Sequence, residues 1–231
     1  MRRVDGRESE GTLRPLSCEL SSLHRADGSA FWKSGATYVL AGVYGPLSPQ
    51  SQTKEGQKAV VSVVIKSPGQ SVEALVYEWT EFLSNILSSC IDCEKYPRAV
   101  VQVVLQIIQA DGSLLASLLH ASVAALMDSG VDLLYLPVAT TCLVKRGEDS
   151  IRLDPTEAEE VEANSTLLVL VNQHRNTEKL LGSHTTGLGL SFERFMLCAH
   201  LASKVSPAIL AFWRLAVEQK LTRESQTLWA K

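Results

Sequence analysis

The sequence predicts an α/β (α+β) fold in which mixed sheets pack around central helices. A β-branched apolar run over residues 99–109 stops at Asp111-Gly112 and resumes as a helix, so a strand, a turn and a helix follow one another directly. That helix, expected over 113–127, is apolar around its circumference apart from small polar residues and His120, which is typical of a helix buried between two sheets. Strands precede a helix in both halves of the chain, and we therefore predict two β-α halves.

The N-terminal segment differs in composition from the rest of the chain. It is polar and contains Arg2, Arg3, Arg7 and Arg14. We expect a flexible basic arm over residues 1–16, which either faces RNA or forms a solvated terminus. A single domain is expected over 17–231.

Turn signals and periodicity place the other elements. Residues 17–44 alternate in polarity around a Gly35 turn and predict two or three antiparallel strands, while 71–90 has one apolar stripe and predicts an amphipathic helix that covers a sheet. Further strands are expected over 58–66, 136–145, 150–153, 166–172 and 178–183, and a last helix, kinked at Pro207, from 191 to about 220.

Composition limits the classes of function. The 231 residues carry a net charge of −3, which argues against a free-standing nucleic-acid binder and requires any RNA to meet a local patch or a partner's surface. We expect no membrane association and an intracellular protein, since no apolar run approaches the roughly 20 residues that span a bilayer. The five cysteines include one pair, Cys90-x-x-Cys93, without histidines at ligand spacing, so we expect no metal site.

A set of short motifs resembles the ribonuclease PH-like proteins and, among them, ring subunits of the eukaryotic RNA exosome. The similarity extends over nearly the whole chain, and the motifs occur in the order of that family. They are Gly28-Ser29-Ala30, Gly35-Ala36-Thr37, the run from Val39 to Pro46, Ala110-Asp111-Gly112, the run from Ala124 to Val131, and Leu153-Asp154-Pro155-Thr156.

The resemblance implies a fold of two β-α halves, a ring of six subunits and single-stranded RNA as the substrate class. Active relatives degrade RNA from the 3′ end: inorganic phosphate attacks the terminal diester and a nucleoside diphosphate leaves. The resemblance also implies other ribonuclease PH-like exosome subunits as partners, roles in the processing and degradation of RNA, including ribosomal RNA, and residence in the nucleus, with its nucleolus, and in the cytoplasm.

Three departures from active relatives concern the chemistry. Leu114 and Leu115 stand where those relatives have a phosphate-holding Thr-Arg pair, and Thr166 stands where they have a second carboxylate. Glutamates replace the RNA-guiding arginines on the helix over 71–90; they are Glu73, Glu78 and Glu81. Loss of one preorganised donor costs a hundred-fold or more in rate, so efficient phosphorolysis is not expected, and whether the chain is an enzyme stays open.

A residual site is still conceivable from the residues that remain. Ser113 would bind phosphate at the start of a helix, and Asp154 and Glu160 would form a catalytic carboxylate pair. Inorganic phosphate would then be the co-substrate, with Mg²⁺ as an optional helper. Candidate RNA contacts are Lys33, Lys66 and Arg98, although all three, like Glu160, have ordinary solvated surface roles as the alternative.

Two functions therefore remain in view. The first is a mainly structural subunit of the exosome ring that forms part of the RNA channel and takes part in 3′-to-5′ RNA processing and degradation. The alternative is a homodimeric nuclease with weak phosphorolytic exoribonuclease activity and metal-assisted hydrolysis of DNA.

Overall fold

A computed structural model describes residues 3, 5–48, 58–67, 73–145, 150–161, 165–174 and 179–229. A five-stranded sheet has the order β1-β2-β3-β5-β4 and a four-stranded sheet the order β7-β6-β8-β9. The first sheet is mixed, since β4 and β5 are parallel and the other pairs antiparallel. Its strands are β1 (Leu16–Leu20), β2 (Gly28–Ser34), β3 (Thr37–Leu47), β4 (Val60–Lys66) and β5 (Val100–Gln109).

The second sheet is antiparallel throughout. Its strands are β6 (Leu136–Lys145), β7 (Ile151–Leu153), β8 (Ser165–His174) and β9 (Lys179–Gly187), and the helices of the fold are α1 (Glu73–Cys90), α2 (Leu114–Ser129), α3 (Glu157–Glu160) and α4 (Phe192–Trp229). The predicted α/β architecture of two β-α halves is confirmed.

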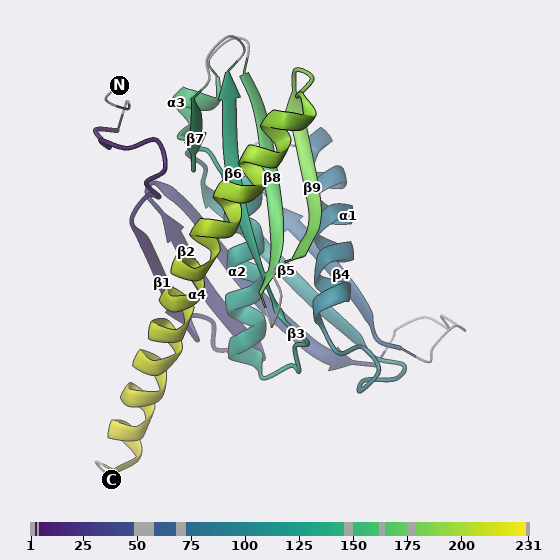
Figure 1. Ribbon diagram of the computed structural model, residues 1–231. Helices are drawn as coiled ribbons and strands as arrows, with labels where there is room; N and C mark the ends of the chain where they lie inside the picture. Colours follow the sequence, from purple (N-terminus) through teal and green to yellow (C-terminus); the bar gives the residue numbers. More distant parts are fainter. Residues whose placement is uncertain are drawn as a thin grey trace.

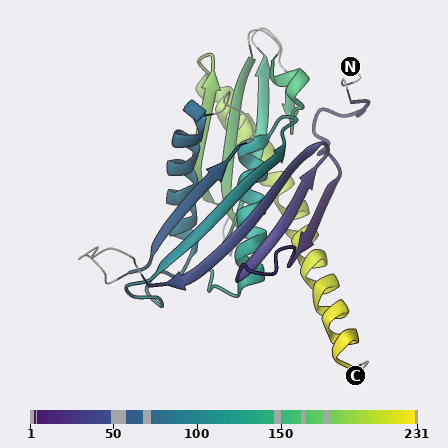
Figure 2. The same ribbon diagram turned by 180° about the vertical axis from the view of Figure 1, so that it is seen from behind.

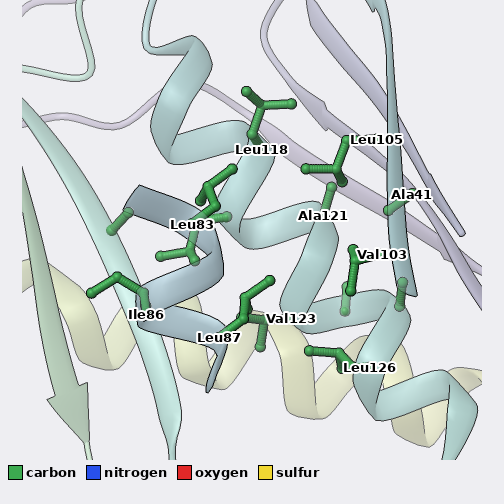
Figure 3. Packing of buried hydrophobic residues seen from close by; sticks show 14 of the residues in the cluster. Ala41, Leu83, Ile86, Leu87, Val103, Leu105, Leu118, Ala121, Val123 and Leu126 are labelled. Atoms are coloured by element: carbon green, nitrogen blue, oxygen red, sulfur yellow. The ribbon is translucent and has the colours of Figure 1, made fainter. Parts of the chain in front are cut away.

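The helix α2 lies between the two sheets, as its all-round apolar composition predicts (Figures 1 and 2). Every residue from Leu115 to Leu126 is buried. Figure 3 shows how it packs: Leu118, Ala121, Val123 and Leu126 lie among Leu83 and Leu87 of α1 and Ala41, Val103 and Leu105 of the first sheet, while Ile86 points away from α2. The core therefore fixes the body of α2 between the two sheets.

The last helix is longer than the sequence predicts. It runs to Trp229, about nine residues beyond the expected end, and its C-terminal part extends away from both sheets (Figure 1). Leu215 and Leu221 are more than half exposed there. Among the described residues, α4 alone is long and apolar enough to cross a bilayer by length and composition, a test that core helices of soluble proteins also pass. The absence of membrane association therefore stays a prediction.

The N-terminal segment is not a flexible arm where the structure describes it. Arg3 and Arg14 are 5% and 4% exposed. Arg3 Nη2 lies 2.7 Å from Glu159 Oε2, and Arg14 Nη2 lies 2.7 Å from Asp154 Oδ1. The arginines that suggest an RNA-facing arm instead tie this segment to the second half of the chain; Arg2 lies outside the described residues.

Candidate functional site

A cleft of about 250 Å³ lies where both halves of the fold meet the start of α2. Residues from α1, α2, α3, β6, β8 and β9 line it: Leu75, Trp79, Ser113, Leu114, Leu115, Thr141, Glu160, Leu167, Val169, His184 and Thr186. This is the place at which the strand-turn-helix segment predicts an anion site.

The Asp111-Gly112 turn fits closely against the segment after β7. Gly112 has φ +74°, and a Cβ there would lie 2.4 Å from the carbonyl oxygen of Pro155. Thr37 Oγ1 donates to the Gly112 carbonyl at 2.8 Å and accepts from the Asp111 N–H at 3.0 Å. Glycine is thus required at this turn both for its conformation and for the close approach of two backbones.

Ser113 adopts a left-handed conformation, with φ +49°, at the N-cap of α2. Its backbone N–H donates to Glu160 Oε1 at 2.6 Å, and its hydroxyl donates to the Pro155 carbonyl at 3.0 Å. Both donors that would hold a phosphate are therefore occupied by groups of the protein itself. The helix start is a favourable position for an anion, and the Glu160 carboxyl group occupies it from within the chain.

Asp154 is almost fully buried, 8% exposed, and is held by Arg14. Its Oδ2 accepts from the backbone N–H and the Nε of Arg14, at 2.9 and 3.0 Å, while its Oδ1 accepts from Nη2 at 2.7 Å. Burial acts to raise the pKa of Asp154, but the hydrogen bonds and charge of Arg14 outweigh it and the pKa lies below its usual value. Asp154 is therefore an ionised, fully engaged carboxylate.

Glu160 has the opposite electrostatics. Burial raises its pKa to about 7, although the Ser113 N–H and the charge of Arg14 act to lower it. The nearby charge of Asp154 raises it further. The structure thus brings the predicted Asp154 and Glu160 together around Ser113, but with one carboxyl group ionised and the other able to hold a proton near neutral pH.

Three positions carry other residues than in active relatives, and the structure places them on two different faces. Leu114 and Leu115 line the cleft as an apolar wall. Thr166 does not face it: its hydroxyl donates to the Leu188 carbonyl at 2.9 Å, on the side of β8 that packs toward α4. Side chains alternate along a strand, so the neighbouring Leu167 lines the cleft instead. Matching Thr166 to the carboxylate position of active relatives by sequence alone does not show which face of β8 it occupies.

The predicted RNA contacts do not form one patch. Lys33 lies on β2, 3.5 Å from Glu19 Oε1 and 4.8 Å from the centre of the Phe31 ring. Lys66 ends β4 and pairs with Gln106, whereas Arg98 precedes Val100, the partner of Val60 at the other end of the same two parallel strands. Six residues of strand separate these ends by about 20 Å. Lys33, Lys66 and Arg98 are all absent from the cleft lining.

Two residues, Trp79 and His184, line the cleft although the sequence does not indicate it. Trp79 belongs to the apolar stripe of α1 and would be expected only to pack against a sheet. His184 lies on β9, in a stretch whose glycines suggest a connection; its Nε2 is 3.0 Å from Glu78 Oε1, and its ring meets the Phe82 ring edge-on at 5.8 Å. His184 lies one residue beyond the strand expected over 178–183, and its place on β9 follows from pairing with β8. In the described part of the chain, no group of three or more metal-ligating side chains occurs.

Comparisons with known proteins identify the family of this chain. Residues 12–132 match the model of the 3′ exoribonuclease family, domain 1 (RNase PH). The chain is 30% identical to an Arabidopsis thaliana protein, "Exosome complex exonuclease RRP46 homolog", over 96% of this chain and 98% of the relative, and 32% identical to the Oryza sativa homologue over 94% and 96%.

Solved structures show the same fold. The crystal structure of rice Rrp46 superposes with a TM-score of 0.83 at 35% identity, covering 92% of this chain and 98% of that one. An Archaeoglobus fulgidus exosome with RNA bound to the active site gives a TM-score of 0.77 at 22% identity, over 91% and 92%, which concerns the fold alone. With a family model over more than half of its length and relatives that match nearly all of it, the chain belongs to the 3′ exoribonuclease family and carries its RNase PH domain.

Proposed function

We propose that this chain is a subunit of an RNA exosome ring that takes part in 3′-to-5′ RNA processing and degradation, mainly as a structural, channel-forming element. Two relatives that match it over almost their full length are named "Exosome complex exonuclease RRP46 homolog", which supports a place in the exosome complex. The observation that carries the structural role is the hydrogen bond from the Ser113 N–H to Glu160, because it fills the anion position at the start of α2.

The cleft chemistry opposes phosphorolysis. Two anions, phosphate and the terminal diester, must be brought together in that reaction, so the site needs cationic or N–H donors directed at both. The described cleft lining contains neither lysine nor arginine, and it adds the acidic Glu160. Arg14 lies close by, but its guanidinium donates to Asp154, Thr37 and the carbonyls of Asp111 and Gly112.

The partners in this role are other RNase PH-like exosome subunits and single-stranded RNA, in the nucleus, including the nucleolus, and in the cytoplasm. No cofactor is needed for it. Only the alternative, a homodimeric nuclease, would need inorganic phosphate and Mg²⁺, and neither the relatives nor the solved structures support that alternative.

The test combines assembly with product analysis. Ring subunits are co-expressed with and without this chain and resolved by size-exclusion chromatography; we expect a complete ring only when the chain is present. In parallel, the purified chain is incubated with 5′-labelled single-stranded RNA, with and without inorganic phosphate, and we expect no shortening of the RNA.

The matched variants are Glu160→Gln and Asp154→Asn. Phosphate-dependent release of nucleoside diphosphates by the wild-type chain, abolished in both variants, would overturn the structural role in favour of an enzyme. Cleavage that persists unchanged in both would place the activity in a contaminant.

A further inference from the structure

We infer that the cleft beside Glu160 binds an uncharged planar group, the base of a nucleoside or of an unstacked RNA nucleotide, and does not bind phosphate. The inference rests on the proposed function, because it names what the cleft of a channel-forming subunit retains for RNA. The ligand it assigns to this site is neutral and planar, whereas the start of a helix commonly binds an anionic phosphate.

The cleft walls are mostly apolar. Six of the residues that line it are aliphatic or aromatic: Leu75 and Trp79 from α1, Leu114 and Leu115 from α2, and Leu167 and Val169 from β8. Sites for small organic groups are typically apolar with a few polar groups that fix orientation. The volume, about 250 Å³, lies just below the roughly 300–1,000 Å³ of drug-sized ligands, which suits a group as small as one base.

Two ring systems supply surfaces on which a base can stack. Trp79 reaches the cleft from α1, and His184 reaches it from β9. The His184 ring is fixed in orientation by the edge-on contact with Phe82 and by Glu78 at 3.0 Å from its Nε2. Stacking on aromatic side chains is how proteins bind unstacked bases without sequence preference.

A few polar side chains complete the lining of the cleft. Ser113, Thr141, Glu160 and Thr186 line the cleft. The Thr141 hydroxyl and the Trp79 Nε1 have no hydrogen-bond partner among the described residues, although buried polar atoms are normally paired. Because the pKa of Glu160 is about 7, its carboxyl group can donate as well as accept near neutral pH, and a base edge presents both kinds of partner.

An anion is excluded by the same residues. The described lining residues include no lysine or arginine, and the Nε2 of His184, which does line the cleft, lies 3.0 Å from Oε1 of the acidic Glu78. The Ser113 N–H is already bonded to Glu160. A phosphate here would lose its hydration without gaining a cationic partner, which is strongly unfavourable.

Binding is tested on the full chain with adenosine, uridine, inorganic phosphate and N-acetyl-leucinamide, each titrated while ligand and protein signals are followed by NMR. We expect saturable binding of both nucleosides and none of phosphate. Phosphate binding as tight as that of adenosine, or no nucleoside binding, would overturn the inference. Equal affinity for N-acetyl-leucinamide would also overturn it, by assigning the cleft to an apolar side chain of a partner protein.

The paired variants are Trp79→Ala and Tyr77→Ala. Both remove an aromatic side chain from α1, but Tyr77 is 77% exposed and is not part of the cleft lining. We expect Trp79→Ala to weaken adenosine binding roughly 5- to 150-fold and Tyr77→Ala to leave it within twofold. Equal effects of the two variants would count against stacking in the cleft.

A third variant keeps the test decisive if Trp79→Ala does not fold. Leu114→Lys places a cation in the cleft, and we expect it to weaken adenosine binding and to permit phosphate binding. An unchanged preference for adenosine in this variant would show that the base binds elsewhere. A chain that assembles into the ring but binds no nucleoside would overturn this inference and leave the proposed function standing.

Discussion

The Glu160 carboxyl group is bonded to the start of α2 through the 2.6 Å contact with the Ser113 N–H, yet burial raises its pKa to about 7. Its ordinary value is 4.5, so the folded chain binds this proton more tightly than the unfolded chain does. The free energy of unfolding therefore includes a contribution that is fully present below about pH 4.5 and is lost as the pH rises through 7. One residue thus makes the cleft less stable at alkaline pH.

We predict that Glu160→Gln raises the free energy of unfolding at pH 8 by on the order of 1–3 kcal/mol and leaves it unchanged at pH 4, because the amide keeps the acceptor and removes the titration. Urea unfolding at both pH values measures the difference. Glu193→Gln is the control, since Glu193 is exposed in the first turn of α4 and is not part of the cleft lining. A stabilisation that is equal at pH 4 and pH 8 would show that Glu160 does not titrate in this range.

Arg14 and Asp154 form a buried pair joined by three hydrogen bonds. We expect Arg14→Met to lower the free energy of unfolding by about 3–5 kcal/mol, because it leaves the Asp154 carboxylate buried without its cation. Arg25→Met is the control, as Arg25 is exposed. A double variant with Asp154→Asn should cost less than the sum of the single changes; strict additivity would mean that the two groups do not interact.

Among the elements, the turn between β5 and α2 has the strictest demands. Gly112 and Gly130 flank α2 with nearly equal φ, +74° and +73°, but only Gly112 faces a backbone at 2.4 Å, whereas nothing lies within 4 Å of a Cβ at Gly130. We predict that Gly130→Ala costs roughly 1 kcal/mol from backbone strain and that Gly112→Ala costs clearly more, because the Pro155–Glu157 segment must move. Thermal unfolding of both variants gives the comparison. Equal losses of stability in the two variants would mean that the Pro155–Glu157 segment moves aside freely.

Local patterns were sufficient to predict most elements, and long-range pairing explains where they were not. The stretches over 99–109 and 136–145 are mostly apolar and rich in β-branched residues, and the structure confirms strands within one residue of those bounds. The strand β9 extends to Gly187 through polar residues because β8 pairs along its whole length, which no local pattern records. The ion pairs of Arg3 and Arg14 were missed for a similar reason, since their partners are 156 and 140 residues away.

The site was only partly predictable. The resemblance brought Ser113, Asp154 and Glu160 to one place, and the structure agrees. Lys33 and Lys66 lie on the same face of the first sheet but three strands apart, and Arg98 lies beyond the other end of β5, which only the sheet register shows. Trp79 and His184 enter the cleft from elements about 100 residues apart, so their proximity depends on the packing of α1 against the second sheet.

At the scale of the whole molecule, both halves share one core. The main cluster joins the first sheet to α2, to β6 and β8 and to α4, and Trp32 of β2 lies 6.2 Å from the Trp213 ring of α4. We predict that the halves unfold together, so that urea transitions followed by tryptophan fluorescence and by far-ultraviolet circular dichroism coincide. Separate midpoints would indicate halves of independent stability. Trp213→Phe serves as the control for the fluorescence signal.

The ion pair between Arg14 of the N-terminal segment and Asp154, which follows β7, has a consequence for the order of synthesis. Arg14 leaves the ribosome 140 residues before Asp154, and at 5–20 residues per second this is a delay of roughly 7–30 s. Through that interval all strands of the first sheet are made, whereas β8, β9 and α4 follow Asp154 in the chain. The first residues of the protein therefore wait for their partner until about two thirds of the chain has been synthesised, and a tag fused ahead of them acts on this late contact and not on the first sheet.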